Sequence, residues 1–454
     1  MKIKRLEIAS FRGIDHLNLE FTQTEPTVFI GINGVGKTSV LDCVAILLSW
    51  LTEGIQFNSE SNKSESKQFG RLLYDPFPNL PKTIKGEGSY FSQHDIKHND
   101  ERTQSQLTII FDTTEFQWSI GTKKSAEHIK QIQSLEPVTN KMYSQWKSDS
   151  NANIPIAVYY PVNRAVIDIS LEREKEPSFL SPILLENSES NSPKQIDAYE
   201  DSLKGVQIGF DSFFQWFKNL EDLENEERRD NPNYRDKQLE AVRQAISSLM
   251  PGFSNLRVRR SPKRMTLTKQ GQELLVNQLS DGEKCLLAMV GDLARRLAIA
   301  SPGLEAPLQG AGVVLIDEIE LHLHPAWQRR IIPELTEIFP NCQFIVTTHS
   351  PQVISNVKPN GIYILEATPG GIIANHPESS FGRDSNRILE DIMGVPERPQ
   401  EIKEKILELF RLIDEGNLAE AKKKREHLAE LIGVDEPEFA RADVLMRRQE
   451  ILNR

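Results

Sequence analysis

The residues best suited to chemistry lie in a glycine-rich loop near the N-terminus. Residues 31–38 have the sequence GINGVGKT, which satisfies the spacing G-x-x-x-x-G-K-[ST] between a predicted strand and a predicted helix. Its glycines allow consecutive backbone N–H groups to surround a β-phosphate at the positive end of a helix. Lys37 would bring its charge to the β- and γ-phosphate oxygens, and the Thr38 hydroxyl would bind Mg²⁺. The loop therefore predicts ATP and Mg²⁺ as cofactors, with nucleotide contacts from Gly34, Val35, Gly36, Lys37, Thr38 and Ser39.

A second group of candidates is a pair of acids that follows an apolar run. Asp317 and Glu318 come directly after residues 313–316, Val-Val-Leu-Ile. A buried parallel strand would deliver both acids to the carboxyl edge of its sheet, where ligands bind in such folds. Asp317 would hold Mg²⁺, directly or through water, and Glu318 would polarise the attacking water as general base. The alternative is an ordinary strand end with two solvated acids, but the phosphate loop favours catalysis.

A histidine ends another apolar run, because His349 follows residues 344–348, FIVTT. It could donate a hydrogen bond to the γ-phosphate or to the attacking water, and so report whether ATP is intact. An isolated histidine is more often structural, but the neighbouring motifs favour function here. His322 and His324 stand two residues apart before a proline and complete no zinc set, so we expect no metal site there.

A fourth candidate precedes a predicted long helix, at residues 278–284, QLSDGEK. Ser280 and the N–H groups around Gly282 would bind an anion at the helix start. The alternative is an ordinary capping box, in which Ser280 and Glu283 satisfy each other's backbone N–H groups.

Alternating strands and helices must position these residues, which predicts an α/β fold. Apolar and polar residues alternate over the first 30 positions, as in an antiparallel meander, and a buried strand over 27–30 leads into the loop and a helix over 38–51. Further strands are predicted at 107–111, 116–120, 154–160, 254–260, 264–268, 273–277, 312–316, 343–347, 362–365 and 371–374. Helices are predicted at 282–300 and 325–339, as a pair around the charged run 221–230, and throughout the chain from residue 401.

The composition favours a cytoplasmic protein that does not associate with membranes. The net charge of −11 excludes general nucleic-acid binding by the whole chain. The three cysteines form no CxxC pair and fit a reducing compartment. The first residues lack a signal-peptide apolar region, and the longest nearly unbroken apolar stretch, 44–51, is far shorter than the roughly 20 residues that span a bilayer.

The four motifs occur in the order found in ATP-binding-cassette (ABC) ATPases, and the chain resembles that family over about residues 1–60 and 270–365. Residues 279–283 (LSDGE) are similar to its LSGGQ signature, with Asp281 and Glu283 as departures. Residues 11–13 (FRG), 31–39 (GINGVGKTS) and 317–325 (DEIELHLHP) resemble its SMC and RecF-like branch. The resemblance implies an ABC-type head with a mixed phosphate-loop sheet, an antiparallel β subdomain and a helical insertion.

From this we expect a head over residues 1–395, with insertions at about 58–105 and 165–252. Residues 396–454 would form a C-terminal helical appendage for assembly or partner binding. Its apolar stripe requires burial, and would either pack on the α/β body or bind a partner helix. The stripe consists of Ile402, Ile406, Leu409 and Ile413.

The resemblance also implies a composite site. Two chains would form a homodimer that encloses ATP between the phosphate loop of one chain and Ser280–Gly282 of the other. Arg12 would contact the nucleotide, and Asn33 would lie beside the γ-phosphate. The family has a glutamine loop after its third core strand. Residues 159–164 (YYPVNR) stand at that place without a glutamine, which leaves Asn163 as the candidate.

Features that the sequence lacks narrow the choice among branches of the ABC family. The 240 or so residues between the phosphate loop and LSDGE show no sustained heptads, so long coiled-coil arms are not expected. No Toprim acid cluster and no HNH or Cys/His cluster is evident, so we expect no nuclease activity from this chain. The closing helix (439–452, FARADVLMRRQEIL) and residues 159–164 (YYPVNR) resemble the PtuA family. Its members are ATPases of Septu antiphage defence that are also found with some retrons and work with a separate HNH endonuclease. This implies a slowly hydrolysing ATP sensor, a homodimer or higher homo-oligomer, that regulates such a nuclease.

Three alternatives remain open. A RecF-like DNA-repair ATPase would bind DNA directly, whereas a defence ATPase could also reach DNA through its partner. A scaffold would hold ATP as a structural ligand. A transporter subunit is disfavoured, because the long insertion and the helical tail have no evident role in coupling to a membrane domain. The direct DNA contact would be a basic hairpin, although a solvated hairpin is the favoured interpretation of Arg257, Arg259, Arg260, Lys263 and Arg264.

Overall fold

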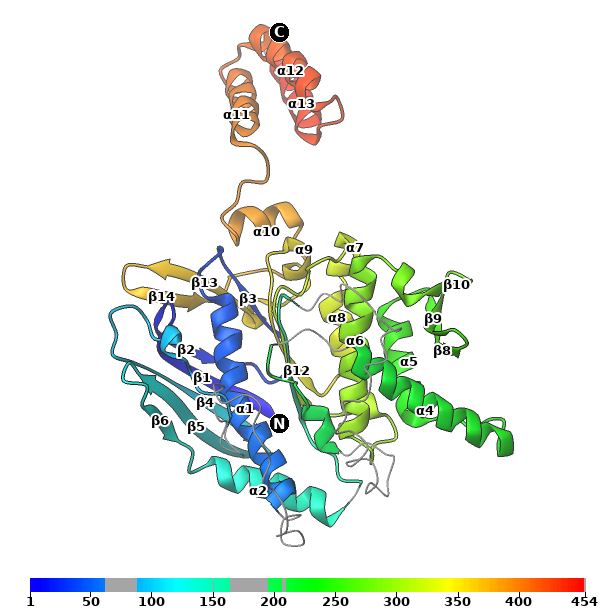
Figure 1. Cartoon of the computed structure of the whole chain (residues 1–454). Coiled ribbons are helices and arrows are strands. Elements are labelled where there is room, and N and C mark those ends of the chain that lie inside the picture. Colours follow the sequence, from blue (N-terminus) through cyan, green and yellow to red (C-terminus); the bar gives the residue numbers. More distant parts are fainter. Residues whose placement is uncertain (62–87, 150, 164–194, 206–209, 453–454) are drawn as a thin grey trace. The chain divides into compact units, whose positions relative to one another are not determined.

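The computed structural model describes the whole chain except residues 62–87, 150, 164–194, 206–209 and 453–454. Two compact units emerge, Met1–Arg383 and Asp384–Arg454, and each is described by itself (Figure 1). The sequence placed the equivalent boundary twelve residues later. Much of the two predicted insertions, including residues 62–70 and 186–194 of their polar stretches, lies outside the described residues.

A six-stranded sheet forms the centre of the first unit. Its order is β14-β13-β3-β12-β11-β7, with five parallel strands and β14 antiparallel at one edge. The four strands β3, β12, β11 and β7 are buried throughout, as expected for near-continuous apolar runs in a parallel sheet. The strands span Thr27–Ile30 (β3), Ile156–Tyr160 (β7), Gly312–Ile316 (β11), Cys342–Thr347 (β12), Ile362–Thr368 (β13) and Gly371–Asn375 (β14), which confirms the predicted strands.

A second, antiparallel sheet confirms the alternating pattern of the N-terminal residues. Its order is β2-β1-β4-β5-β6, and the apolar side chains of β1 that the pattern places on one face are fully buried. Its strands span Lys2–Phe11 (β1), Ile14–Glu20 (β2), Arg102–Phe111 (β4), Thr114–Lys123 (β5) and His128–Gln131 (β6). Helix α1 (Lys37–Ser61) contacts strands of both sheets, and α2 (Leu135–Ser148), which was not predicted, packs on α1. Helix α1 is apolar and long enough to cross a membrane, but 67% of its candidate span is buried inside the protein.

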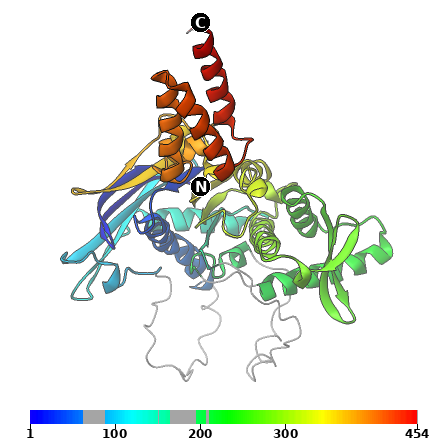
Figure 2. The ribbon, with the colours of Figure 1, turned by 90° about the horizontal axis from the view of Figure 1, so that it is seen from above.

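Helices and a small sheet form the opposite side of this unit, drawn in green in Figures 1 and 2. Helix α6 (Asp281–Ala300) is buried on almost every side, and α5 (Lys237–Leu249) packs along it. The charged run 221–230 was predicted to separate two helices, but it lies within α4 (Phe210–Asp230). Strands β8 (Phe253–Arg260), β9 (Lys263–Lys269) and β10 (Gln272–Leu275) form an antiparallel sheet.

The sequence predicts one continuous helix over residues 325–339, and this prediction is wrong. The structure has α7 (Pro325–Gln328) and α8 (Ile331–Ile338). Pro333 has no N–H to donate to the carbonyl of residue 329, and its ring would clash with that carbonyl in a continuous helix. The two helices are separated at residues 329 and 330, where that carbonyl lies.

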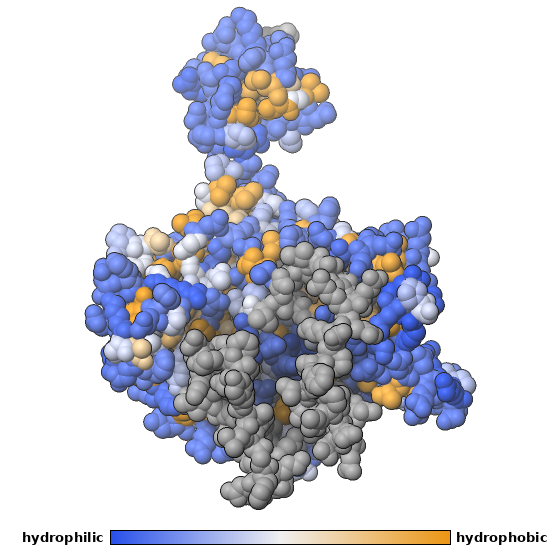
Figure 3. Space-filling view, viewed as in Figure 1, coloured by the Kyte–Doolittle hydropathy of each residue, from blue (hydrophilic) through white to orange (hydrophobic). Residues whose placement is uncertain are grey.

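The second unit consists of helices only, with α11 (Gln400–Asp414), α12 (Leu418–Ile432) and α13 (Pro437–Leu452) after the short α10 (Ser385–Asp391). The apolar stripe is buried within the unit itself, where it packs against α12 and α13. Some apolar surface remains exposed on this unit (Figure 3), including Leu407 and Val444. The core of the unit comprises Ile406, Leu409, Ile413, Ala421, Leu428, Phe439, Ala442 and Met446.

Candidate functional site

The phosphate loop joins β3 to α1 and depends on its glycines. Gly31, Gly34 and Gly36 all have positive φ, a region that side chains with a Cβ rarely adopt. At Gly31 a Cβ would also meet the carbonyl oxygen of Leu365 at 2.5 Å. The loop therefore curls tightly between the sheet and the first turn of α1, which begins at Lys37.

Lys37 folds back over this loop. Its Nζ donates to the carbonyl oxygens of Gly31 (2.9 Å) and Ile32 (3.0 Å), and the residue is only 6% exposed. Burial lowers the pKa of Lys37, while three nearby acids, of which Asp317 acts most strongly, oppose that shift. The ammonium thus lies where the phosphate loop and the acidic strand end meet, as a phosphate-binding charge requires.

Asp317 connects the acidic strand end to the phosphate loop. The Thr38 hydroxyl donates to its Oδ2 at 2.8 Å, and the Thr347 hydroxyl donates to its Oδ1 at 2.5 Å. The parallel register of β11 and β12 pairs Ile316 with Val346, so residues 317 and 347 leave the same edge of the sheet together. Thr347 was missed from the sequence. The available signal was a hydroxyl residue at the end of a strand predicted to lie beside the acidic one.

Glu318 has an unusual backbone conformation. Its φ is 45°, and its N–H donates to the Thr347 hydroxyl oxygen at 2.7 Å. A residue with a side chain in this region costs on the order of 1 kcal/mol or more, and such residues cluster at functional sites. The half-buried Glu318 is therefore held next to Asp317 by the same threonine that binds Asp317.

His349 follows β12 at this edge and is half-buried. Its backbone N–H donates to Oε1 of Glu320 at 2.6 Å, so Glu320 is a second site residue that sequence reasoning missed. His324 caps α7, because its Nδ1 accepts the N–H of Ala326 at 3.2 Å.

Arg12 is held by two acids. Its side chain donates to Asp42 (2.5 Å) and to Asp95 (2.8 Å). Burial works against the charged form, but these two bonds raise the pKa of Arg12. Asp42 lies four residues after Thr38 on α1, so Arg12 is about one helical turn from the phosphate loop. Asp42 also accepts the Tyr159 hydroxyl at 2.9 Å.

The segment in place of the glutamine loop follows β7, which lies beside β11. Asn163 is exposed there, and Arg164 lies outside the described residues. The last residue of β7, Tyr160, donates its hydroxyl to the buried Asp292 of α6 at 3.0 Å. Arg295 and Arg296 each donate to Asp292 at 2.7 Å, so a buried ionic group ties this strand end to α6.

The start of α6 is the capping box that the sequence offered as an alternative. Ser280 accepts the N–H of Glu283 (3.4 Å), and Glu283 accepts the N–H of Ser280 (3.0 Å). In the described structure every hydrogen bond of Ser280 is made with Glu283 or Lys284. Gly282 is required by close packing, since a Cβ there would overlap the carbonyl oxygen of His322. Ser280 itself remains exposed.

Three arginines of the basic hairpin pair with acids. Arg257 and Arg259 both pair with Glu273, and Arg260 pairs with Glu221 and Asp222. Hydrogen bonds and charge from Arg259 and Arg257 lower the pKa of Glu273 to about 2. This pairing supports the interpretation as a solvated hairpin.

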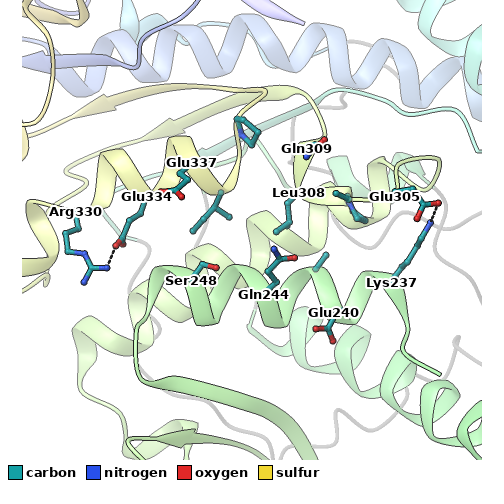
Figure 4. A pocket seen from close by; sticks show the side chains of 15 residues that line it. Lys237, Glu240, Gln244, Ser248, Glu305, Leu308, Gln309, Arg330, Glu334 and Glu337 are labelled. Atoms are coloured by element: carbon teal, nitrogen blue, oxygen red, sulfur yellow. Dashed lines mark hydrogen bonds and ion pairs between the residues drawn. The ribbon is translucent and has the colours of Figure 1, made fainter. Parts of the chain in front are cut away.

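A separate groove of about 630 Å³ lies between α5 and α8 (Figure 4). Its rim contains the ion pairs Lys237–Glu305 and Arg330–Glu334. None of the predicted site residues is among the described residues that line it, so it is distinct from the phosphate loop.

The phosphate loop between β3 and α1, the acid pair at the end of β11 and the capped start of α6 define an ABC-type P-loop ATPase. Residues 148–355 match the family model described as "AAA domain, putative AbiEii toxin, Type IV TA system", and residues 1–69 match a model of a protein of unknown function. An SMC head bound to the C-terminal winged-helix domain of ScpA is a structural neighbour, with a TM-score of 0.46 and 15% identity over 83% of this chain and 98% of that one.

Curated relatives carry the assignment further. The chain is 30% identical to the retron Ec83 probable ATPase of Escherichia coli, over 89% of this chain and 78% of that protein. It is 24% identical to the Septu protein PtuA of Bacillus thuringiensis, over 91% and 90%. The chain therefore belongs to the family of retron and Septu PtuA ATPases.

Proposed function

We propose that the protein binds ATP with Mg²⁺ at the phosphate loop, hydrolyses it slowly, and serves as the sensor subunit of an antiphage defence complex. The observation that carries this proposal is the hydrogen-bonded chain from Thr38 through Asp317 to Thr347. It joins the phosphate loop to the acidic strand end, two segments almost 280 residues apart in sequence.

The residues present fit a magnesium ion. The Thr38 hydroxyl and the Asp317 carboxylate are hard oxygen donors 2.8 Å apart at the head of the loop, which are the ligands that Mg²⁺ prefers. When bound, the ion would neutralise charge on the phosphate oxygens. Both side chains would exchange their mutual hydrogen bond for the ion.

The remaining residues take separate roles toward ATP. Lys37 neutralises charge on the β- and γ-phosphates, and the backbone N–H groups of residues 33–38 surround the β-phosphate. Glu318 accepts a proton from the attacking water as general base, and its backbone is already fixed by Thr347. His349 donates a hydrogen bond to the γ-phosphate or to that water, from the neighbouring strand end.

A second copy of the chain completes the site. Ser280 is exposed at the first turn of the 20-residue helix α6, where the positive end of the helix favours an anion. In a homodimer, or a higher homo-oligomer, Ser280 and Gly282 of one protomer would cover the γ-phosphate of ATP held by its partner. Arg12 would turn from its two acids to the nucleotide.

The family membership supports the biological role. The relatives are named for retron and Septu systems, and we propose that this chain likewise acts in antiphage defence in the cytoplasm. A separate HNH endonuclease would be its partner, controlled by the nucleotide state of the homodimer. DNA would then be reached through that partner.

The test compares Glu318→Gln with a matched control, Glu226→Gln, in which an exposed glutamate of α4 is changed in the same way. Loss of a general base is expected to lower kcat about 10²-fold or more, while ATP remains bound and the dimer stays closed. The control keeps wild-type turnover. Rapid hydrolysis by Glu318→Gln would refute the general-base assignment, and full defence activity without turnover would favour structural ATP.

A further inference from the structure

Three carboxylates lie within four residues directly after β11, and two of them take part in the proposed ATP hydrolysis. Asp317 has a hydroxyl on each of its oxygens, and Glu318 is the proposed general base. The third, Glu320, is half-buried and binds the segment that carries His349. Its Oε1 accepts the backbone N–H of His349 at 2.6 Å, and its Oε2 accepts the Thr348 hydroxyl at 2.7 Å.

The backbone after β11 explains how Glu320 reaches this segment. The positive φ of Glu318 turns the chain sideways, and the N–H of Ile319 then donates to the carbonyl oxygen of Thr347 at 3.0 Å. The chain thus crosses the end of the neighbouring strand β12. Glu320 comes next and lies over the residues that follow that strand.

The His349 segment is anchored on both sides of the histidine. The N–H of Thr348 donates to the carbonyl oxygen of Phe29 at 3.1 Å, and Ser350 caps α9 (Pro351–Ile354). Between these anchors the backbone N–H of His349 itself donates to Glu320, while the N–H of Ser350 donates to the Thr348 hydroxyl oxygen at 3.0 Å. The acceptor of the His349 N–H is a carboxylate oxygen at 2.6 Å, and hydrogen bonds to carboxylates are of the stronger kind, roughly twice a neutral one.

We propose that Glu320 is a positioning residue that fixes the backbone of His349, so that the imidazole is presented to the γ-phosphate side of the nucleotide. Both carboxylate oxygens of Glu320 bind the segment that carries His349, and we call this pair of bonds the clamp. Asp317 differs because one of its oxygens accepts the hydroxyl of Thr38 at the phosphate loop. The inference rests on the proposed ATP hydrolysis. It assigns the three acids three different tasks: metal binding, proton acceptance and positioning.

The first measurement follows the clamp without nucleotide. Amide hydrogen exchange of the full-length chain is compared for the wild type, Glu320→Ala, Glu320→Gln and the exposed control Glu226→Ala. We expect faster exchange in peptides covering residues 347–350 for both Glu320 variants, and unchanged exchange in peptides from α1 and β7. Unchanged exchange at 347–350 in Glu320→Ala would overturn the clamp.

The second measurement tests the role in the reaction, with kcat and KM for ATP in Glu320→Ala, His349→Ala and the double variant. We expect Glu320→Ala to lower kcat about tenfold or more while KM changes less than about threefold, because the residue contacts no substrate. The double variant should match His349→Ala within about twofold, since residues that act as one unit are not additive. If Glu320 had a merely structural role, the double variant would lose kcat by the product of the two single-variant factors.

The outcomes separate the two proposals. Faster exchange with additive kinetic losses would overturn the positioning role and leave ATP hydrolysis intact. Wild-type kcat in His349→Ala would refute the role of His349 in the proposed function, and with it the purpose assigned to Glu320, although the exchange result would still report the clamp. The Glu320→Gln variant keeps the side-chain volume and gives the same comparison if the alanine variant is poorly folded.

Discussion

The hydroxyl of Thr347 donates to Oδ1 of Asp317 at 2.5 Å, thirty residues away in sequence. The hydroxyl oxygen of Thr347 also accepts the backbone N–H of Glu318 at 2.7 Å. One side chain therefore orients both acids of the predicted catalytic pair. A hydroxyl is suited to this task because it donates to a carboxylate and accepts from an amide at once.

Thr347→Val removes both bonds without changing the volume of the side chain. We expect kcat to fall about tenfold, which is what the loss of roughly one such hydrogen-bond interaction in the transition state corresponds to. Half-saturation by Mg²⁺ should also move to higher concentration, because Asp317 loses its second partner. Thr347→Ser keeps the hydroxyl and should stay near the wild type. Equal activity of the valine and serine variants would contradict this role.

Lys37→Ala separates nucleotide binding from folding. The substitution removes the charge that binds phosphate, and we expect ATP affinity, measured by isothermal titration calorimetry, to fall more than about a hundredfold. The thermal unfolding midpoint without nucleotide should change little, because burial of the ammonium already opposes its two bonds to carbonyl oxygens. An unfolded or disassembled Lys37→Ala protein would instead favour the scaffold hypothesis.

The buried acid of α6 predicts a pH dependence of stability. Burial works to raise the pKa of Asp292, but Arg296 and Arg295 outweigh it and lower the pKa to about 2. Because the folded-state value lies below the unfolded one, the stabilisation is present above about pH 4 and is lost as the pH falls toward 2. The shift corresponds to roughly 2 kcal/mol. Urea unfolding at a series of pH values from 7 to 2 would measure it.

Asp292→Asn tests the same ion pairs by removing the charge of the carboxylate that Arg295 and Arg296 share. It leaves two largely buried guanidinium groups without their carboxylate, so we expect a loss of about 3–5 kcal/mol in the free energy of unfolding at pH 7. The variant should also lose part of the acid dependence of the wild type. Wild-type stability in this variant would show that the ion pairs are not coupled to folding.

The basic hairpin predicts a negative result for direct DNA binding. Alanine at Arg257, Arg259 and Arg260 together should leave DNA affinity unchanged at two salt concentrations, because all three arginines are already paired with acids. Fluorescence anisotropy with a labelled duplex is a suitable measurement. A lost DNA stimulation of the ATPase would revive the RecF-like alternative.

The C-terminal unit offers a comparison of two leucines on the same helix. Leu409 is fully buried in the helical core and Leu407 is 59% exposed. Leu409→Ala should destabilise this unit by about 2–5 kcal/mol and make residues 384–454 sensitive to protease, whereas Leu407→Ala should have little effect. ATP binding should be unchanged in both variants. A loss of ATP binding in Leu409→Ala would show that the two units depend on each other.

The amino-acid sequence by itself predicted the features that depend on local pattern. The glycines and Lys37 of the loop and the apolar runs that become buried strands are short-range signals. The capping box of Ser280 and Glu283 is also a short-range signal, which the sequence offered as an alternative to an anion site. Glycine permits positive φ whatever surrounds it, and an unbroken apolar run indicates burial on both faces of a sheet. The predicted roles of Glu318 and His349 in hydrolysis stay predictions.

The tertiary structure alone decided which side chains meet. Thr347 and Glu320 act on residues about thirty positions away, and Arg12 meets Asp95 across 83 residues. These contacts depend on the order and register of strands, which place the ends of β11 and β12 side by side. A hydroxyl or carboxylate carries no local mark of its future partner, because hydrogen-bond partners are set by position in space rather than by neighbours in the chain.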